Sequence, residues 1–328
     1  MSSEPGAAAP SVETAREAIG RVREEVAKAI VGHEGAVTGL LTALLVRGHV
    51  LLEGVPGTAK TLLTKALAAA LDLDEKRVQF TPDLMPSDVT GQLVYRQAEG
   101  TFHFREGPVF TNLLLADEVN RTPPKTQAAL LEAMEERQVT AGGQTYPLTP
   151  PFFVLATQNP IELEGTYPLP EAQLDRCLLN IFMDYLPEQE EVAMVAATTA
   201  PPGEKPQKVF SPEEVQELQT LVRQVPVSQH VVEYAVKLVR ATRPDNAQAP
   251  EFVRKQVKWG AGSRASQALV LAGKARALLN GRYTVAVEDI KTLAPPVLRH
   301  RVIPNFQAEA EGVRTDDIVR KLCAEVRE

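Results

Sequence analysis

Apolar residues recur every three or four positions between Val12 and Ile30, a spacing that predicts an amphipathic helix. The same reasoning predicts helices over Glu34–Arg47, over Ala59–Leu71 and over Pro124–Arg137. Between them lie short apolar runs that are too short for helices and are expected to form buried strands, at 49–53, 111–116 and 152–156. Strands that alternate with helices indicate a parallel sheet covered on both faces.

Two segments depart from this alternation. Residues 91–108 contain two short strand-like runs around Ala98-Glu99-Gly100, and residues 138–147 contain two around Gly142-Gly143. Each segment is therefore predicted to form a β-hairpin inserted into the α/β domain. The aromatic residues of the first hairpin, Tyr95, Phe102 and Phe104, either contact a partner or pack between subunits.

The pattern changes at a proline-rich stretch, 198–210, which is expected to be a linker. Helices are expected beyond it at 214–223, 228–242, 264–280 and 287–300, the last broken at Pro295-Pro296. No strand is expected there. We therefore predict a disordered lead-in at 1–12, an α/β domain at 13–197 and a helical domain at 211–328.

Composition narrows the class of protein. The 328 residues have 44% hydrophobic and 23% charged content, typical of a globular protein, and a net charge of -7 that disfavours a general nucleic-acid binder. The segment Met1–Pro10 has no apolar core, and Ala36–Val50 is interrupted by polar residues, so we expect neither a signal peptide nor a membrane span. Two distant cysteines indicate no disulfide framework. A soluble cytoplasmic protein is expected.

The first chemical signal is Gly54–Thr61, Gly-Val-Pro-Gly-Thr-Ala-Lys-Thr, between a predicted strand and a predicted helix. Backbone N–H groups at a helix N-terminus favour an anion, and glycines let them approach closely. Lys60 would reach the terminal phosphates of a nucleotide, and the Thr61 hydroxyl would bind Mg²⁺. Ala59 departs from the general pattern, which has glycine before the lysine. The alternative is a plain turn that opens a helix.

The second signal is the apolar strand that ends in Asp117-Glu118. In a P-loop ATPase a carboxylate at such a strand end holds Mg²⁺, and the next one polarises the attacking water. A third strand ends in Thr157-Gln158-Asn159-Pro160, where Asn159 could hold that water. Taken singly, these are solvated carboxylates and an Asn-Pro turn. Together with the phosphate loop they indicate ATP hydrolysis.

Further segments make the resemblance specific. From about residue 13 to its end the chain resembles the AAA+ ATPases, and among them the MoxR family. The segments that carry the resemblance, besides the phosphate loop, are 117–125 (DEVNRTPPK), 130–136 (LLEAMEE), 156–160 (ATQNP), 169–176 (LPEAQLDR) and 260–265 (GAGSRA). Two departures remove no charge: Cys177 stands where phenylalanine is usual, and Gly262-Ser263 where Ser-Pro is usual.

The resemblance implies an AAA+ three-layer αβα nucleotide-binding domain with a parallel sheet, followed by a small all-α lid. It implies that Asn159 is sensor 1, that Arg176 is the arginine finger for a neighbouring subunit, and that Arg264 is sensor 2. Thr61 and Asp117 would hold Mg²⁺, and Glu118 would be the catalytic carboxylate. The residues implied in ATP binding are Val31, Gly32, Gly54, Pro56, Gly57, Thr58, Ala59, Lys60, Thr61 and Leu62. The alternative for each arginine is a structural ion pair, for example Asp175 or Glu171 with Arg176.

The function that the resemblance implies is remodelling or activation of a partner protein by a homo-hexameric ATPase, with a von Willebrand factor A-domain protein as the expected partner. A nucleic-acid motor is the alternative, and the acidic composition disfavours it. A small-molecule phosphotransferase would need no arginine from a neighbour. His103 and His300 have no Cys or His at metal-binding spacing, so no metal other than Mg²⁺ is expected.

Overall fold

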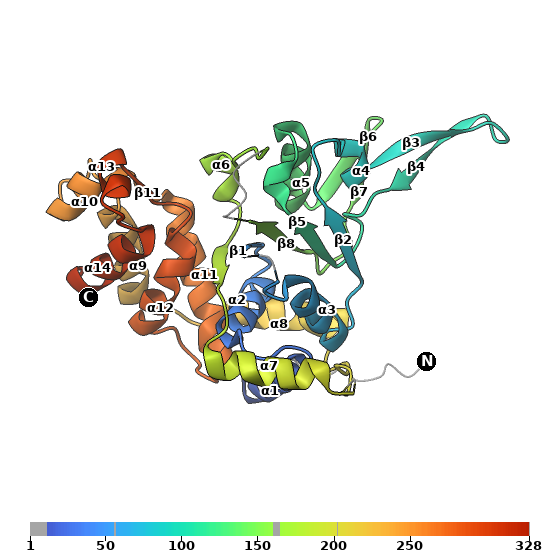
Figure 1. Ribbon diagram of the computed structural model, residues 1–328. Coiled ribbons are helices and arrows are strands. Elements are labelled where there is room, and N and C mark those ends of the chain that lie inside the picture. Colours follow the sequence, from blue (N-terminus) through green and yellow to red (C-terminus); the bar gives the residue numbers. More distant parts are fainter. Residues whose placement is uncertain (1–11, 56, 160–164, 202, 328) are drawn as a thin grey trace, which may run out of the picture.

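The structure, a computed structural model, describes residues 12–55, 57–159, 165–201 and 203–327. At its centre lies a sheet of five parallel strands in the order β2-β5-β8-β1-β9 (Figure 1). The strands are β1 Val50–Gly54, β2 Glu75–Gln79, β5 Leu113–Asp117, β8 Phe153–Gln158 and β9 Leu179–Met183. The three strands expected from the apolar runs are the central neighbours β5, β8 and β1, and one further strand lies at each edge.

Neighbouring residues of the central strands enter different cores. Leu52 and Leu115 join a core with the helices below the sheet in Figure 1, whereas Leu51 and Leu114 join a core with the helices above it. The first group of helices is α1 Val12–Ala27, α2 Glu34–Leu45 and α3 Lys60–Ala70, and the second is α4 Pro86–Thr90 and α5 Pro124–Glu136. Helices on both faces confirm the predicted three-layer αβα domain.

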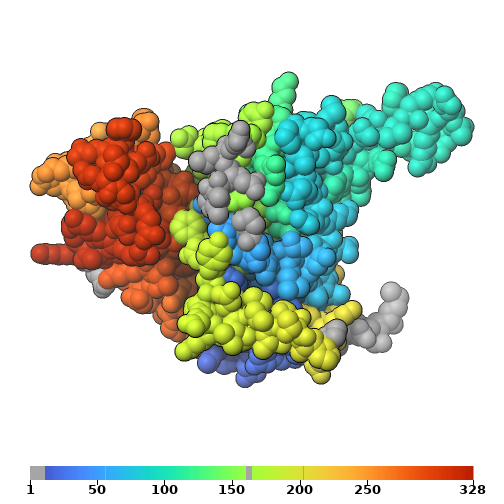
Figure 2. Space-filling model, in the orientation of Figure 1, coloured from blue at the N-terminus to red at the C-terminus, as the bar shows by residue number. Residues whose placement is uncertain are grey.

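Both predicted hairpins are present. The first is formed by β3 Gly91–Arg96 and β4 Thr101–Glu106, and the second by β6 Gln138–Ala141 and β7 Gln144–Pro147. Phe104 stacks on Tyr146 with ring centroids 4.0 Å apart, which joins the bases of the two hairpins. The β3–β4 hairpin then extends far beyond the domain (Figures 1 and 2).

Helix α7 Glu188–Thr199 and the 198–210 segment follow the sheet. The chain then enters α8 Pro212–Gln224, which begins with a capping box formed by Ser211 and Glu214. Helix α8 packs against α2, where Gln219 donates to Leu44 O at 2.8 Å.

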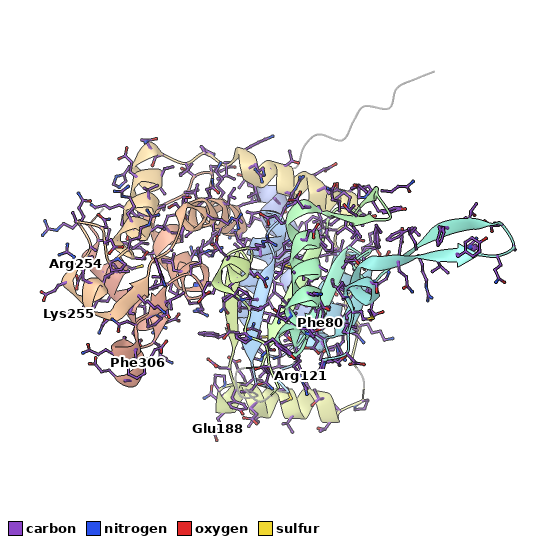
Figure 3. The ribbon with its side chains drawn as sticks, turned by 90° about the horizontal axis from the view of Figure 1, so that it is seen from above. Phe80, Arg121, Glu188, Arg254, Lys255 and Phe306 are labelled. Carbon is purple, nitrogen blue, oxygen red and sulfur yellow. The ribbon has the colours of Figure 1, made fainter. Side chains whose placement is uncertain are left out.

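The remaining helices form the lid. They are α9 Gln229–Ala241, α10 Glu251–Gln256, α11 Ser263–Leu279, α12 Val287–Leu298, α13 Phe306–Ala310 and α14 Thr315–Glu325. Phe306, Arg254 and Lys255 lie at the end of the lid that is farthest from the β3–β4 hairpin (Figure 3). Among the described residues, none of the helices combines the length and the apolarity needed to cross a membrane.

Two expectations for this region are wrong. Strand β10 Val257–Trp259 pairs with β11 Ile303–Pro304, although no strand was expected after residue 211. Strands of three and two residues are too short to leave an apolar run in the sequence. Helix α12 also continues through Pro295 and Pro296. Ala294 and Val297 on either side are fully buried, so packing maintains the helix where two backbone donors are missing.

Candidate nucleotide-binding site

The phosphate loop connects β1 to α3, as its sequence predicted. Gly54 lies so close to β9 that a side-chain Cβ there would be only 2.5 Å from Met183 O, which explains the glycine. Gly57 and Ala59 both have left-handed backbone conformations, with φ of 85° and 58°. The left-handed conformation at Ala59 is the physical reason why glycine is usual at this position. Pro56, which was also expected to bind nucleotide, lies outside the described residues.

Lys60 is the first residue of α3, and its side chain turns back over the loop. Its Nζ donates to Gly54 O at 2.6 Å. Burial lowers the pKa of Lys60, while the nearby carboxylates of Asp117 and Glu118 act in the opposite direction. The first turn of α3 has no side-chain cap, so its N–H groups are available to an anion.

The two acidic residues follow each other at the end of β5 but have separate sets of partners. The Asp117 carboxylate accepts a hydrogen bond from Thr157 Oγ1 at 2.6 Å and pairs with Arg77 Nη2, also at 2.6 Å. The Glu118 carboxylate accepts from Gln79 Nε2 at 2.7 Å and pairs with Arg121 at 3.0 Å.

Thr157 connects this acidic pair to β8. Besides donating to Asp117, its hydroxyl accepts the backbone N–H of Glu118 at 2.8 Å. The Glu118 backbone is left-handed with φ 57°, which brings its N–H into reach. Sequence reasoning missed Thr157, Gln79 and Arg77. The signal for Thr157 was its place at the tip of a predicted strand, two residues before Asn159.

A cavity of about 450 Å³ lies over the loop and between the strand ends. Its lining contains Gly57, Thr58, Ala59, Lys60, Thr61, Leu62, Arg77, Asp117, Glu118 and Asn159. The structure thus brings the loop, both acids and the sensor-1 candidate to one cavity. Asn159 is buried, at 5% exposed, and is one of the residues that line this cavity.

A second hollow of about 700 Å³ continues from the first on the other side of the loop. The two share Gly57, Thr58, Ala59 and Leu62. Its other walls come from the segment after α1, including Val31, and from α7, including Met194. Gly32, next to Val31, has a left-handed backbone and lies against α7 at Glu190. A largely apolar hollow that continues into a polar one containing Lys60 has the shape and polarity needed for a base and its polyphosphate.

The oxygen atoms in the 450 Å³ cavity suit a hard cation. Mg²⁺ prefers oxygen ligands, keeps several waters, and is commonly held by one or two protein groups plus substrate phosphates. The Thr61 hydroxyl and the Asp117 carboxylate fit that demand. In the part of the chain that the structure describes, no group of three or more His, Cys, Asp or Glu side chains could hold a metal ion by itself.

Arg176 and Arg264 are not among the residues that line this cavity. Arg176 Nε pairs with Glu135 Oε2 at 2.8 Å, and Arg264 Nη2 pairs with Glu135 Oε1 at 3.1 Å. Arg264 also approaches Asp175 at 3.5 Å. One carboxylate, near the end of α5, thus holds both arginines. We call these three side chains the Glu135 cluster.

A buried arginine supports the segment that carries Arg176. Arg301 is 7% exposed, and its guanidinium donates to the Asp175 carboxylate at 2.7 Å and to the backbone oxygens of Asp175 and Cys177. These bonds link the turn after α12 to the segment after α6 Glu171–Leu174. Sequence reasoning missed Arg301, because nothing in its neighbourhood marks a contact over 126 residues.

Family models match both parts of the chain. Residues 49–179 match the model described as ATPase family associated with various cellular activities (AAA), and residues 250–322 match the AAA lid domain. The first match contains the phosphate loop, both acids and Arg176. The second contains Arg264.

Individual proteins are similar over nearly the whole chain. The uncharacterized protein YeaC of Bacillus subtilis is 45% identical over 94% of each chain. Chaperone MoxR1 of Mycobacterium tuberculosis is 42% identical over 92% of this chain and 80% of its own, and Protein MoxR of Methylorubrum extorquens is 33% identical over 88% of each. A crystal structure from Cytophaga hutchinsonii, 45% identical, superposes with a TM-score of 0.89 over 96% of each chain.

Proposed function

The chain belongs to the MoxR family of AAA+ ATPases, and we propose that it hydrolyses Mg²⁺-ATP as a homo-hexameric ring to remodel or activate a partner protein. The observation that carries the proposal is the single cavity that contains Lys60, Thr61, Asp117, Glu118 and Asn159. This cavity fits the phosphates of a nucleotide, and the adjoining 700 Å³ hollow fits its base.

Each residue has a role that its position supports. The Lys60 ammonium and the first turn of α3 bind the terminal phosphates, and Thr61 and Asp117 hold the metal. When bound, Mg²⁺ neutralises phosphate charge. Glu118, whose carboxylate is held by Gln79, accepts the proton of the attacking water, and Asn159 orients that water.

The first test is nucleotide binding by Lys60→Ala, measured by isothermal titration calorimetry. Loss of the ammonium should weaken ATP binding at least about 100-fold, because a buried charge-assisted contact to phosphate is lost. Lys65→Ala, in the same helix but outside the cavity lining, is the matched control and should bind normally. Normal ATP affinity in Lys60→Ala would rule out the assigned phosphate site.

The Glu135 cluster supports a site that is completed by a second subunit. The side chains of Arg176 and Arg264 are 31% and 48% exposed. Both pair with the Glu135 carboxylate, outside the nucleotide cavity of their own chain. We propose that this cluster faces the nucleotide of the adjacent subunit in the ring. Mobile guanidinium groups are what the cavity needs to stabilise charge on the γ-phosphoryl oxygens.

Mixing of inactive variants tests this arrangement. Arg176→Ala keeps its own phosphate site, and Lys60→Ala keeps its arginines, so mixed rings should recover part of the ATPase activity. A mixture of Arg264→Ala with Lys60→Ala tests Arg264 in the same way: recovery of activity indicates that Arg264 acts between subunits, and no recovery indicates that it acts within its own. Specific activity should also rise with protein concentration. If mixed rings form, shown by native mass spectrometry, but no activity returns, Arg176 does not act across subunits.

For the partner, the proposal is a cytoplasmic protein with a von Willebrand factor A domain. The name of one relative, Chaperone MoxR1, supports a protein substrate, and the projecting β3–β4 hairpin offers a surface for one. The ring centroids of Tyr95 and Phe102 lie 5.2 Å apart on this hairpin, and the two residues are 51% and 67% exposed. Stable exposed aromatic pairs are frequent in binding surfaces.

Replacement of residues 97–100, at the hairpin tip, provides a control for replacement of Tyr95 and Phe102 by serine. Affinity capture of A-domain proteins from the same genome, with ATP present, should succeed for the tip variant and fail for the aromatic one. Both variants should still form rings. Equal capture by the two would exclude the aromatic pair as the contact.

A further inference from the structure

Arg77 is a cation within the nucleotide cavity that the assigned roles leave without a function. It lies on the edge strand β2, and its side chain is 47% exposed. Nη2 and Nε donate to the same oxygen of Asp117, Oδ2, at 2.6 and 3.2 Å. The Asp117 side chain is only 14% exposed, so this arginine covers much of the one oxygen that Thr157 leaves available.

The same guanidinium reaches the second acid through one intermediate. Arg77 Nη2 donates to Gln79 Oε1 at 3.0 Å, and Gln79 Nε2 donates to Glu118 Oε2 at 2.7 Å. Strand β2 places residues 77 and 79 on one face, because side chains alternate along a strand. A single exposed cation is therefore connected to both carboxylates of the site.

We propose that Arg77 is a stand-in cation: it holds the Asp117 carboxylate while no metal is bound and is displaced when Mg²⁺ arrives with the nucleotide. The inference rests on the proposed function, because it assigns Mg²⁺ to Asp117. It adds a regulatory residue that sets how strongly nucleotide binding depends on the metal.

The physical reason is competition for one oxygen. Asp117 Oδ2 has two lone pairs, and Arg77 Nη2 and Nε both donate to it, so binding of Mg²⁺ to this oxygen needs at least one of the two hydrogen bonds to break. A guanidinium and Mg²⁺ on the same oxygen would also repel each other strongly. Without the metal, the pairing compensates a carboxylate that would otherwise repel the triphosphate. Arg77 thus favours metal-free nucleotide binding and opposes metal binding.

The test measures affinity, not turnover. A fluorescent, non-hydrolysable ATP analogue is titrated into wild-type protein and Arg77→Gln, once in EDTA and once in saturating Mg²⁺. The Kd in EDTA divided by the Kd in Mg²⁺ reports the coupling between metal and nucleotide. Arg77→Gln should raise this ratio about tenfold, through weaker binding in EDTA and a lower Mg²⁺ requirement, because charge-assisted hydrogen bonds are lost.

Matched variants separate this effect from general charge and from folding. Lys76→Gln removes one positive charge from the same strand, where Nζ donates to Phe110 O, and should leave the ratio unchanged. Arg77→Met keeps the aliphatic stem and should behave like Arg77→Gln even if the glutamine variant folds poorly. In an Asp117→Asn background, Arg77→Gln should have no effect on the ratio.

The outcomes are distinct. A ratio within about twofold of wild type in both Arg77 variants, with nucleotide still bound, overturns the stand-in role and leaves the proposed ATPase function intact. An equal rise in the ratio for Lys76→Gln overturns it also, because the effect is then one of net charge. Absence of nucleotide binding by the wild type in both conditions overturns the proposed function together with this inference.

Discussion

The nucleotide cavity and the Glu135 cluster contain the same kinds of groups in opposite arrangements. In the cavity, each carboxylate is held by partners from neighbouring strands, and the Asp117 and Glu118 side chains are 14% and 24% exposed. In the Glu135 cluster, two arginines share one carboxylate, and the three side chains are 31–48% exposed. The charged residues that line the cavity balance, with Lys60 and Arg77 against Asp117 and Glu118. The cluster has two positive side chains and one negative one, and its side chains are more exposed.

The difference indicates which groups of the active site come from one chain and which come from a second chain. The cavity contains donors, acceptors and a cation in one chain, so binding of a nucleotide needs no second subunit. The cluster has one more positive than negative charge, and beyond Glu135 the Asp175 carboxylate approaches Arg264 at 3.5 Å. Removal of a cavity residue should therefore affect a subunit by itself, whereas removal of a cluster residue should affect its neighbour.

The largest effect is expected from the cluster. Arg176→Ala should reduce kcat by about a thousandfold, the range known for arginine fingers, and leave the Kd for ATP unchanged. Arg254 is an exposed arginine at the far end of the lid. Arg254→Ala is therefore the control and should retain full activity. Steady-state kinetics combined with calorimetry separates the two quantities. If ATP affinity falls as much as kcat, Arg176 contacts nucleotide within its own subunit.

In the cavity, Glu118→Gln should reduce kcat by about 100-fold or more and preserve ATP binding, because only the proton acceptor is lost. The glutamine can still accept from Gln79, so the local structure should be kept. Single-turnover measurement of phosphate release tests this directly. Unchanged turnover would show that another group activates the water.

The comparison also explains what the sequence could predict. Gly54–Thr61, Asp117, Glu118 and Asn159 all lie at the ends of the central strands, which are buried on both faces and so have recognisable apolar runs. Their convergence follows from the parallel sheet. The edge strand β2 has only Val78 buried, so no pattern marked it, and its two site residues, Arg77 and Gln79, were missed with it.

The Glu135 cluster could not be predicted as a cluster. Glu135, Arg176 and Arg264 come from α5, from the segment after α6 and from α11, and the arrangement depends on how the lid packs on the αβα domain. Arg301 and the β10–β11 pair are likewise long-range contacts without a local signature. The proposed domain boundary at 198–210 remains a prediction, and α8 beyond it packs on α2.

Thr157 offers a smaller, structural test of the cavity. Thr157→Val removes the hydroxyl that donates to Asp117 and accepts from Glu118 N–H, and so leaves two polar groups without their partner. The free energy of unfolding should fall by about 2 kcal/mol, measured by urea denaturation in EDTA. Thr157→Ser keeps the hydroxyl and should cost less than half of that. No loss in Thr157→Val would mean that the two hydrogen bonds do not stabilise the fold, and equal losses for the two variants would mean that the methyl group contributes as much as the hydrogen bonds.

The smallest effect concerns His49, which joins the supports of both regions. Its Nε2 donates to Met134 O at 3.0 Å, next to Glu135, and its Nδ1 accepts Val154 N–H at 3.0 Å, in the strand that leads to Thr157. Both nitrogens are used by the neutral ring, and burial lowers the pKa of His49 to about 4.

A lowered pKa for a histidine means that the unfolded chain binds its proton first as the pH falls. The contribution to stability is therefore intact above pH of about 6.5, the ordinary value, and declines progressively from there towards the folded pKa of about 4. At a pH of about 5.5 the loss of folding free energy from this one residue should be about 1 kcal/mol.

The variant His49→Gln tests this, because glutamine cannot titrate. Its stability should fall less than that of the wild type between pH about 7 and about 5.5, measured by urea denaturation at both pH values. Parallel losses in the two proteins would mean that the folded protein binds a proton on His49 as readily as the unfolded chain does, and that this ring does not contribute to the pH dependence of stability.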